Sequence, residues 1–103
     1  MKKPANTLGF KLPVDSLPTI PVRKILIGGE EIPVYQGLIS YVAPSIPTGL
    51  IEGASHSVYA FNFSDIVNYN GQTASTLGVN IGTTVEYALK DGKVIRIQLP
   101  NNL

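Results

Sequence analysis

The chain has 103 residues, no cysteine and a net charge of +1. This length supports one packed core rather than two ordinary domains, and the lack of cysteine excludes disulfides, thiolate metal sites and cysteine nucleophiles. No stretch approaches the roughly 20 apolar residues of a membrane-spanning helix. Lys2 and Lys3 precede proline and polar residues, not the apolar run of a signal peptide. We therefore expect a soluble, cytoplasmic protein with no membrane partner.

The composition favours strands over helices. Val, Ile and Thr together supply 27 residues, whereas Ala and Glu supply only 6 and 4. Branching at Cβ suits a pleated sheet better than a helix. The 10 glycines and 8 prolines are spread along the chain and divide it into short segments. The predicted fold class is all-β.

Residues 1–24 form a basic, proline-rich arm in this reading. They contain four prolines, which neither a helix nor a central strand tolerates, and five basic residues against one acidic residue, a net charge of +4. The remaining residues, 25–103, carry a net charge of −3. The arm is extended and also apolar, so it is either disordered or packed across this domain or a neighbouring copy. The second arrangement predicts a homo-oligomer held by the arm.

Several strands follow the arm. Residues 22–27 are predicted as a strand that ends at Gly28 and Gly29, and residues 32–42 continue the pattern with a bulge or tight bend at Gly37. A short strand is predicted at 50–52. A helical turn at 64–67 is expected to lead into a polar loop at 68–75.

The segment 58–66, VYAFNFSDI, is the most informative stretch. Alternation along a strand places Tyr59, Phe61 and Phe63 on one face and Val58, Ala60 and Asn62 on the other. If the aromatic face points inward it is core. If it points outward it is a platform on which bases stack. The pattern leaves both alternatives open.

The last two predicted strands form a hairpin. Residues 83–89 and 94–99 each place apolar side chains on one face, and a two-residue Asp91-Gly92 turn would pair Tyr87 with Arg96. A three-residue loop, with Gly92 in the left-handed conformation, instead pairs Tyr87 with Ile95 and Val85 with Ile97. Matching apolar faces favours the three-residue loop.

From Gly37 onward the chain resembles a cold-shock domain. Residues 37–42 (GLISYV) stand where the family has its G-x-V-K-W-F strand, and 46–51 (IPTGLI) where it has K-G-F-G-F-I. Residues 58–66 resemble the V-F-V-H-F-S-x-I strand, 82–89 resemble G-x-x-V-x-F-x-V, and 94–99 close the sheet. The resemblance implies a small five-stranded OB-like β-barrel, preceded here by the arm, that binds single-stranded DNA or RNA.

The resemblance also implies where nucleic acid binds. On the third strand, anchoring on Ser64 places Ala60, Asn62 and Phe63 at the base-contacting positions, whereas anchoring on Val58 places Tyr59 and Phe61 there. The family's basic residue of the first strand is Ser40 here, and Ile46, Thr48 and Leu50 replace the lysine and two aromatics of the second strand. The predicted nucleic-acid-binding residues are Tyr41, Tyr59, Phe61, Asn62, Phe63, Lys90, Lys93 and Arg96. The last three are alternatively the solvated charges of a turn.

Nothing in the sequence favours an enzyme. His56 has neither cysteine nor clustered carboxylates nearby, so no metal site and no cofactor are expected. Ser55 and Ser57 adjoin His56, but neighbours in a chain seldom point at each other, and no orienting acid is evident. Two hypotheses remain: a weak single-stranded nucleic-acid-binding module, and an OB-fold module for structure or protein interaction that has lost nucleic-acid binding and oligomerises through its arm.

Overall fold

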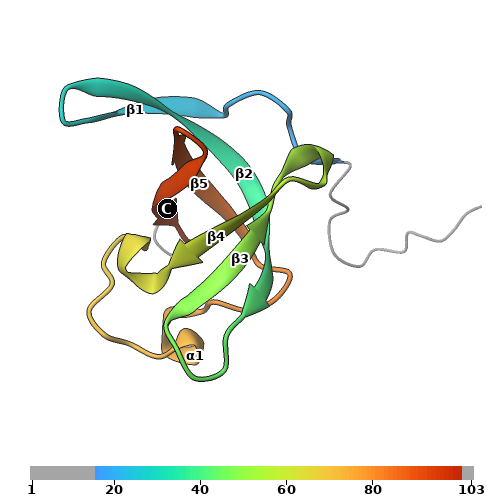
Figure 1. Ribbon diagram of the computed structural model, residues 1–103, viewed down its shortest axis with the longest axis vertical. Helices are drawn as coiled ribbons and strands as arrows, with labels where there is room; N and C mark the ends of the chain where they lie inside the picture. The colour runs from blue at the N-terminus through green and yellow to red at the C-terminus, as the bar shows by residue number, and fades with distance from the viewer. Residues whose placement is uncertain (1–15, 101–103) are drawn as a thin grey trace, which may run out of the picture.

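The computed structural model describes residues 16–100 as a curled antiparallel sheet (Figure 1). Strands β1 to β6 span Arg23–Ile27, Glu30–Val42, Thr48–Glu52, Val58–Asn62, Thr84–Lys90 and Lys93–Gln98. Their order is β4-β3-β2-β5-β6, and β1 pairs with the first residues of β2. Residues 1–15 of the predicted arm lie outside the described residues, as do residues 101–103. Of the rest of the predicted arm, residues 16–22 contain no strand, whereas Arg23 and Lys24 begin β1.

The sheet curls until its two outer strands approach each other. Strands β2, β3 and β4 follow one another as hairpins, and β5 then returns to the opposite edge of β2. Just after β4, Ile66 forms a parallel bridge with Ile97 of β6, and the Val67 N–H donates to the Ile97 carbonyl at 2.9 Å. This order and partial closure are those of an OB-like barrel. The predictions of an all-β class and a small OB-like barrel are confirmed.

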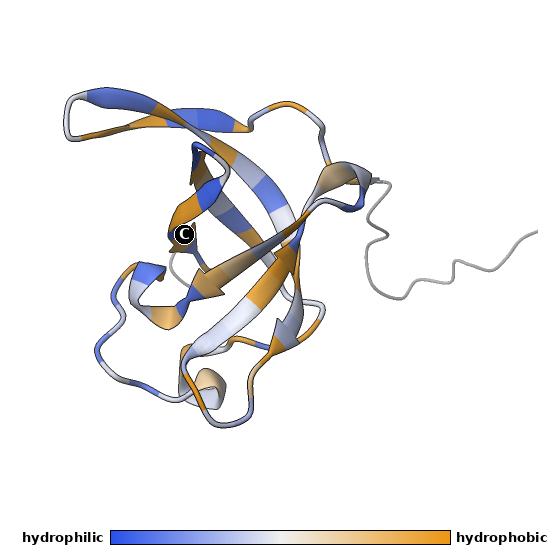
Figure 2. Ribbon diagram, viewed as in Figure 1, coloured by the Kyte–Doolittle hydropathy of each residue, from blue (hydrophilic) through white to orange (hydrophobic). Residues whose placement is uncertain are grey.

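The core fills the inside of the curl. Hydrophobic residues recur along the strands (Figure 2), and in β3 buried residues alternate with partly exposed ones, so that one face of the strand points to the core. The main cluster takes its buried residues from strands β2 to β6, from the segment between β4 and β5, and from the residue that follows β6. They are Ile39, Ile51, Phe61, Phe63, Ile66, Leu77, Val79, Val85, Tyr87, Val94, Ile97 and Leu99. Burying this apolar area is the main favourable contribution to folding.

A second, smaller cluster supports the β1–β2 hairpin, which extends from the barrel at the top of Figure 1. Its buried members are Ile32, Val34 and Ala88, with Ile25, Ile27 and Ile95 packed against them. Two ion pairs connect the hairpin to β5: Arg23 with Glu86, and Lys90 with Glu30, whose Nζ and Oε1 lie 2.7 Å apart. The hydrogen bond to Glu30 and the charge of its carboxylate raise the pKa of Lys90.

Gly37 does not mark the predicted bulge or bend. Strand β2 runs through it and pairs it with Val85, and the register shifts between Ile39 and Tyr41 instead. A Cβ at Gly37 would lie 2.8 Å from Ile51 Cγ2 and 2.8 Å from Tyr87 Cε1. Glycine is required here because two core side chains approach the backbone.

The predicted register of the β5–β6 hairpin was wrong. Lys90 pairs with Lys93 across a two-residue turn, in which both Asp91 (φ 53°) and Gly92 (φ 79°) are left-handed. This is the favoured geometry for a two-residue hairpin connection. The pairing then shifts between Ala88 and Leu89, so that Tyr87 faces Ile97. The left-handed conformation of Gly92 was as predicted.

Three short helical turns lie in the connections between β3 and β4 and between β4 and β5. η2 spans Ala54–His56, η3 spans Phe63–Asp65 and α1 spans Ala74–Leu77. η3 lies one residue before the predicted helical turn at 64–67, and α1 begins inside the predicted loop at 68–75. The Thr73 side chain accepts a hydrogen bond from the Thr76 N–H at 3.3 Å, which explains why this polar stretch starts a helix.

Candidate functional site

The aromatic face of β4 points inward. Phe61 and Phe63 are 3% and 4% exposed, and their rings pack with centroids 6.1 Å apart. Tyr59 is half-buried, and its ring lies 5.6 Å from that of Tyr87. The two phenylalanines are therefore core residues, which is the first of the two alternatives left open by the sequence. A buried ring offers no face to a base, so Phe61 and Phe63 are removed from the candidate stacking residues.

The outward face of β2, β3 and β4 is built from cross-strand neighbours. Leu50 of β3 pairs with Tyr41 on one side and with Ala60 on the other, and Thr48 pairs with Asn62. Tyr41 is 47% exposed, and Ala60 and Asn62 are exposed as well. These pairs form a continuous outer surface whose one aromatic side chain is Tyr41.

A groove with a cavity volume of about 630 Å³ lies between this surface and the β5–β6 turn. Its lining residues are Tyr41, Thr48, Gly49, Leu50, Ala60, Phe61, Asn62, Asp65, Gly92, Lys93 and Val94. Four of the residues predicted to bind nucleic acid line the groove: Phe61, which is buried, and Tyr41, Asn62 and Lys93. Sequence reasoning did not select Thr48 or Leu50, although Leu50 lies beside Tyr41 as soon as β2 and β3 are paired.

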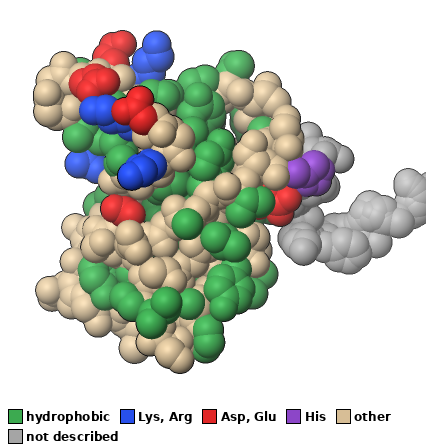
Figure 3. Space-filling view, viewed as in Figure 1, with side chains coloured by type: hydrophobic (Ala, Val, Ile, Leu, Met, Phe, Trp, Pro, Cys, Tyr) green, Lys and Arg blue, Asp and Glu red, His purple; other side chains and the backbone are tan. Residues whose placement is uncertain are grey.

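The groove carries little charge. Lys93 is the one basic side chain among the described residues that line it, and Asp65 is the one acidic side chain. One Asp65 carboxylate oxygen accepts a hydrogen bond from the Asn62 N–H at 3.3 Å, which occupies part of that acidic group. In Figure 3 most charged side chains lie over the β1–β2 hairpin and nearby strand ends, whereas the surface over β3 shows mainly hydrophobic and uncharged groups.

The other predicted basic residues lie elsewhere. Lys90 is paired with Glu30. Arg96 lines a smaller cavity of about 80 Å³, together with Arg23 and Glu86. The three cations, close in sequence, therefore do not form one phosphate-binding patch.

His56 is exposed at the end of η2, and its Nδ1 lies 3.0 Å from Glu52 Oε2. Residues 16–100 contain no group of three or more His, Cys, Asp or Glu side chains placed to hold a metal ion. Within the same residues, no helix has the length and apolar character needed to cross a membrane.

The comparisons with known proteins identify no relative. No protein-family model matches the sequence, and neither the curated proteins nor the solved structures contain a significant match. The groove and its chemistry therefore provide the basis for a functional proposal.

Proposed function

We propose that the groove binds single-stranded DNA or RNA weakly. The observation that carries the proposal is that one open groove on an OB-like barrel holds an exposed aromatic ring, an exposed amide and a basic side chain. Tyr41 provides a surface on which one base stacks, Asn62 offers a donor and an acceptor to a base edge, and Lys93 contacts a phosphate.

The electrostatics of the groove support weak binding. Phosphate neutralisation supplies most of the affinity of non-specific nucleic-acid complexes, and each neutralised phosphate of a single strand contributes a slope of about −0.7 to log K against log salt. With Lys93 alone in the groove, we expect a slope of about −0.7, hence an affinity loss of only about two- to threefold between 50 and 200 mM salt. A broad basic track would give a much steeper dependence.

The test is a titration of a fluorescent oligonucleotide by fluorescence anisotropy at several salt concentrations. Tyr41→Ala is expected to weaken binding about tenfold, because stacking of one base contributes about 1–3 kcal/mol. Lys93→Gln is expected to flatten the salt dependence. Arg96→Gln removes the same charge outside the groove and is expected to leave both the affinity and the slope nearly unchanged.

Two results would contradict the proposal. One is the absence of binding at about 100 µM protein even at low salt, where electrostatic attraction is strongest. The other is equal weakening by Lys93→Gln and Arg96→Gln, which would show that overall charge, not the groove, attracts the strand.

A second candidate function is protein interaction through the same face. Val58, two residues before Ala60 on the same face of β4, is 55% exposed, and Ile46 in the connection between β2 and β3 is 59% exposed, so apolar side chains reach the surface outside the groove as well. The occupant that fits is the apolar arm of a second copy, which agrees with the expected homo-oligomer. Sedimentation of the full chain and of a chain lacking residues 1–15 distinguishes the candidates: arm-mediated oligomers dissociate on truncation, and a monomer in both cases contradicts this candidate.

A further inference from the structure

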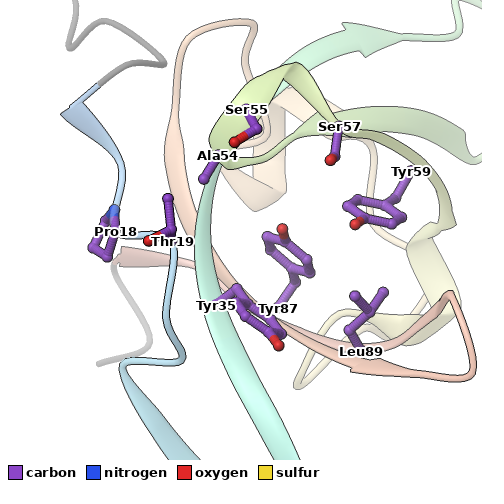
Figure 4. Close-up of a pocket in the computed structure, with 9 residues that line it drawn as sticks. All are labelled: Pro18, Thr19, Tyr35, Ala54, Ser55, Ser57, Tyr59, Tyr87 and Leu89. Atoms are coloured by element: carbon purple, nitrogen blue, oxygen red, sulfur yellow. The ribbon is translucent and has the colours of Figure 1, made fainter.

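A second cavity, of about 260 Å³, opens among β2, β4, β5 and the turn around η2. We call it the tyrosine pocket, because Tyr35, Tyr59 and Tyr87 line it from three different strands (Figure 4). It shares no lining residue with the groove. The two cavities are therefore separate features, and the tyrosine pocket is not used by the proposed nucleic-acid binding.

The three rings form one continuous wall. The Tyr87 ring lies 5.9 Å from that of Tyr35 and 5.6 Å from that of Tyr59, centroid to centroid, with tilted planes. Tyr87 is buried, and its hydroxyl is packed against the backbone of Gly53, which fixes the position of its ring. Tyrosine has an apolar ring and a polar tip, so such a wall contacts the apolar face of a ligand while its hydroxyls contact the polar edge.

The opposite rim is a strained turn. Ser55 and His56 both have left-handed backbone, with φ of 60° and 61°, although neither is glycine. The turn is closed by a hydrogen bond from the Gly53 N–H to the Ser57 carbonyl at 2.7 Å and by the contact of His56 with Glu52. Two consecutive strained residues persist only where the surrounding structure determines them, and such strain concentrates at ligand-binding sites.

The chemistry of the lining selects the ligand. The side-chain polar groups of the described lining residues are all hydroxyls, those of Thr19, Ser55, Ser57 and the three tyrosines, and no charged or amide side chain is among them. A hydroxyl both donates and accepts hydrogen bonds. Such a lining matches a ligand whose own polar groups are hydroxyls and gives no compensation for a buried charge. The volume, below the range of about 300–1,000 Å³ for ordinary ligand pockets, fits a single ring.

We propose that the tyrosine pocket binds one neutral sugar residue. The apolar C–H face of the sugar lies against Tyr59 and Tyr35, and its hydroxyl groups exchange hydrogen bonds with Ser55, Ser57 and Thr19. This site is independent of the groove, so a protein that binds an oligonucleotide in one place would bind a monosaccharide in another.

The test is an NMR titration of the uniformly ¹⁵N-labelled full chain with D-glucose, D-galactose and N-acetyl-D-glucosamine, with uracil, which has no sugar, as a flat, neutral comparator. A ligand of this size is expected to bind with a Kd of about 1–10 mM. At least one sugar is expected to shift the amide signals of residues 53–57, Tyr59 and Tyr87. Uracil is expected to leave those signals in place.

Variants separate this site from the groove. Tyr59→Leu and, as a milder change, Ser57→Val are expected to weaken sugar binding at least fivefold while leaving oligonucleotide binding unchanged. Tyr41→Leu, a matched tyrosine substitution in the groove, is expected to do the reverse. Absence of shifts at about 100 mM of every sugar, shifts that persist in both Tyr59→Leu and Ser57→Val, or a response of residues 53–57 to uracil alone would each overturn the proposal.

Discussion

Replacing Gly53 by alanine is expected to lower the free energy of unfolding by about 2 kcal/mol, the usual cost of forcing an extra carbon into a packed core. The backbone itself tolerates alanine, because φ at Gly53 is −101°. A Cβ there would lie 2.3 Å from the Tyr87 hydroxyl oxygen but 3.4 Å from its Cζ. The whole clash is therefore with one atom, and in the Tyr87→Phe background the same change is expected to cost less than about 0.5 kcal/mol.

Urea unfolding of the four proteins of this cycle, followed by circular dichroism, measures the coupling. The matched control is Tyr59→Phe. The added Cβ would lie 3.7 Å from a ring carbon of Tyr59, which is an ordinary contact, and removing the Tyr59 hydroxyl does not change it. Gly53→Ala should cost as much in the Tyr59→Phe background as in the natural chain. An equal cost in the Tyr87→Phe background would show that the tyrosine hydroxyl does not define this side of the tyrosine pocket.

The strands were predictable because local features determine them. Val and Ile favour extended backbone, and Gly28 and Gly29 end β1 where left-handed residues were needed. The orientation of β4 was not predictable from its own alternation, since alternation defines two faces without saying which is inside. Pairing decides it: Tyr59 pairs with the buried Ile51, and Phe61 pairs with the buried Gly49, so the aromatic face joins the core.

The β5–β6 hairpin shows why the regular alternation of inward and outward side chains cannot be extended across a β-bulge. The prediction placed Ile95, Ile97 and Leu99 on one face, but the register shift turns Val94 and Ile97 toward the core and directs Ile95 to the second cluster. The sequence argued against a two-residue turn because regular pairing would have mismatched the apolar faces. The bulge leaves one residue of β6 unpaired, and the two-residue turn is then compatible with the apolar faces. No local signal marks the bulge, because Val94 and Ile95 are both suitable core residues.

The groove depends on contacts between distant residues, and this limited its prediction. Lys90, Lys93 and Arg96 were grouped because they are close in sequence, yet their side chains leave the hairpin in different directions. Conversely, Tyr41 and Asn62 are far apart in the chain and line one cavity because both lie on the strands that pair with β3. Sequence reasoning selected Tyr41, Asn62 and Lys93 individually, but only the register of β2, β3 and β4 brings them together.

Alkaline pH is expected to destabilise the fold through Tyr87. Burial, followed by the charges of Tyr59 and Tyr35, raises the pKa of Tyr87 from 10.0 to about 12. Between pH 10 and 12 the unfolded chain therefore releases a phenolic proton that the folded chain retains, so the stability is fully present below pH 10 and falls as pH rises through this window. A difference of this size corresponds to a loss of about 2–3 kcal/mol.

Urea unfolding at pH 9 to 12 measures this loss. In Tyr87→Phe no phenol titrates at this position, so the decline is expected to be smaller by most of that 2–3 kcal/mol. Tyr41→Phe is the control, because its hydroxyl lies on an exposed side chain, and it should decline with pH as the natural chain does. Lysine titration, including that of the Lys90–Glu30 pair, is common to all three proteins and cancels in the comparison. Parallel declines in Tyr87→Phe and in the natural chain would mean that the buried phenol does not control alkaline stability.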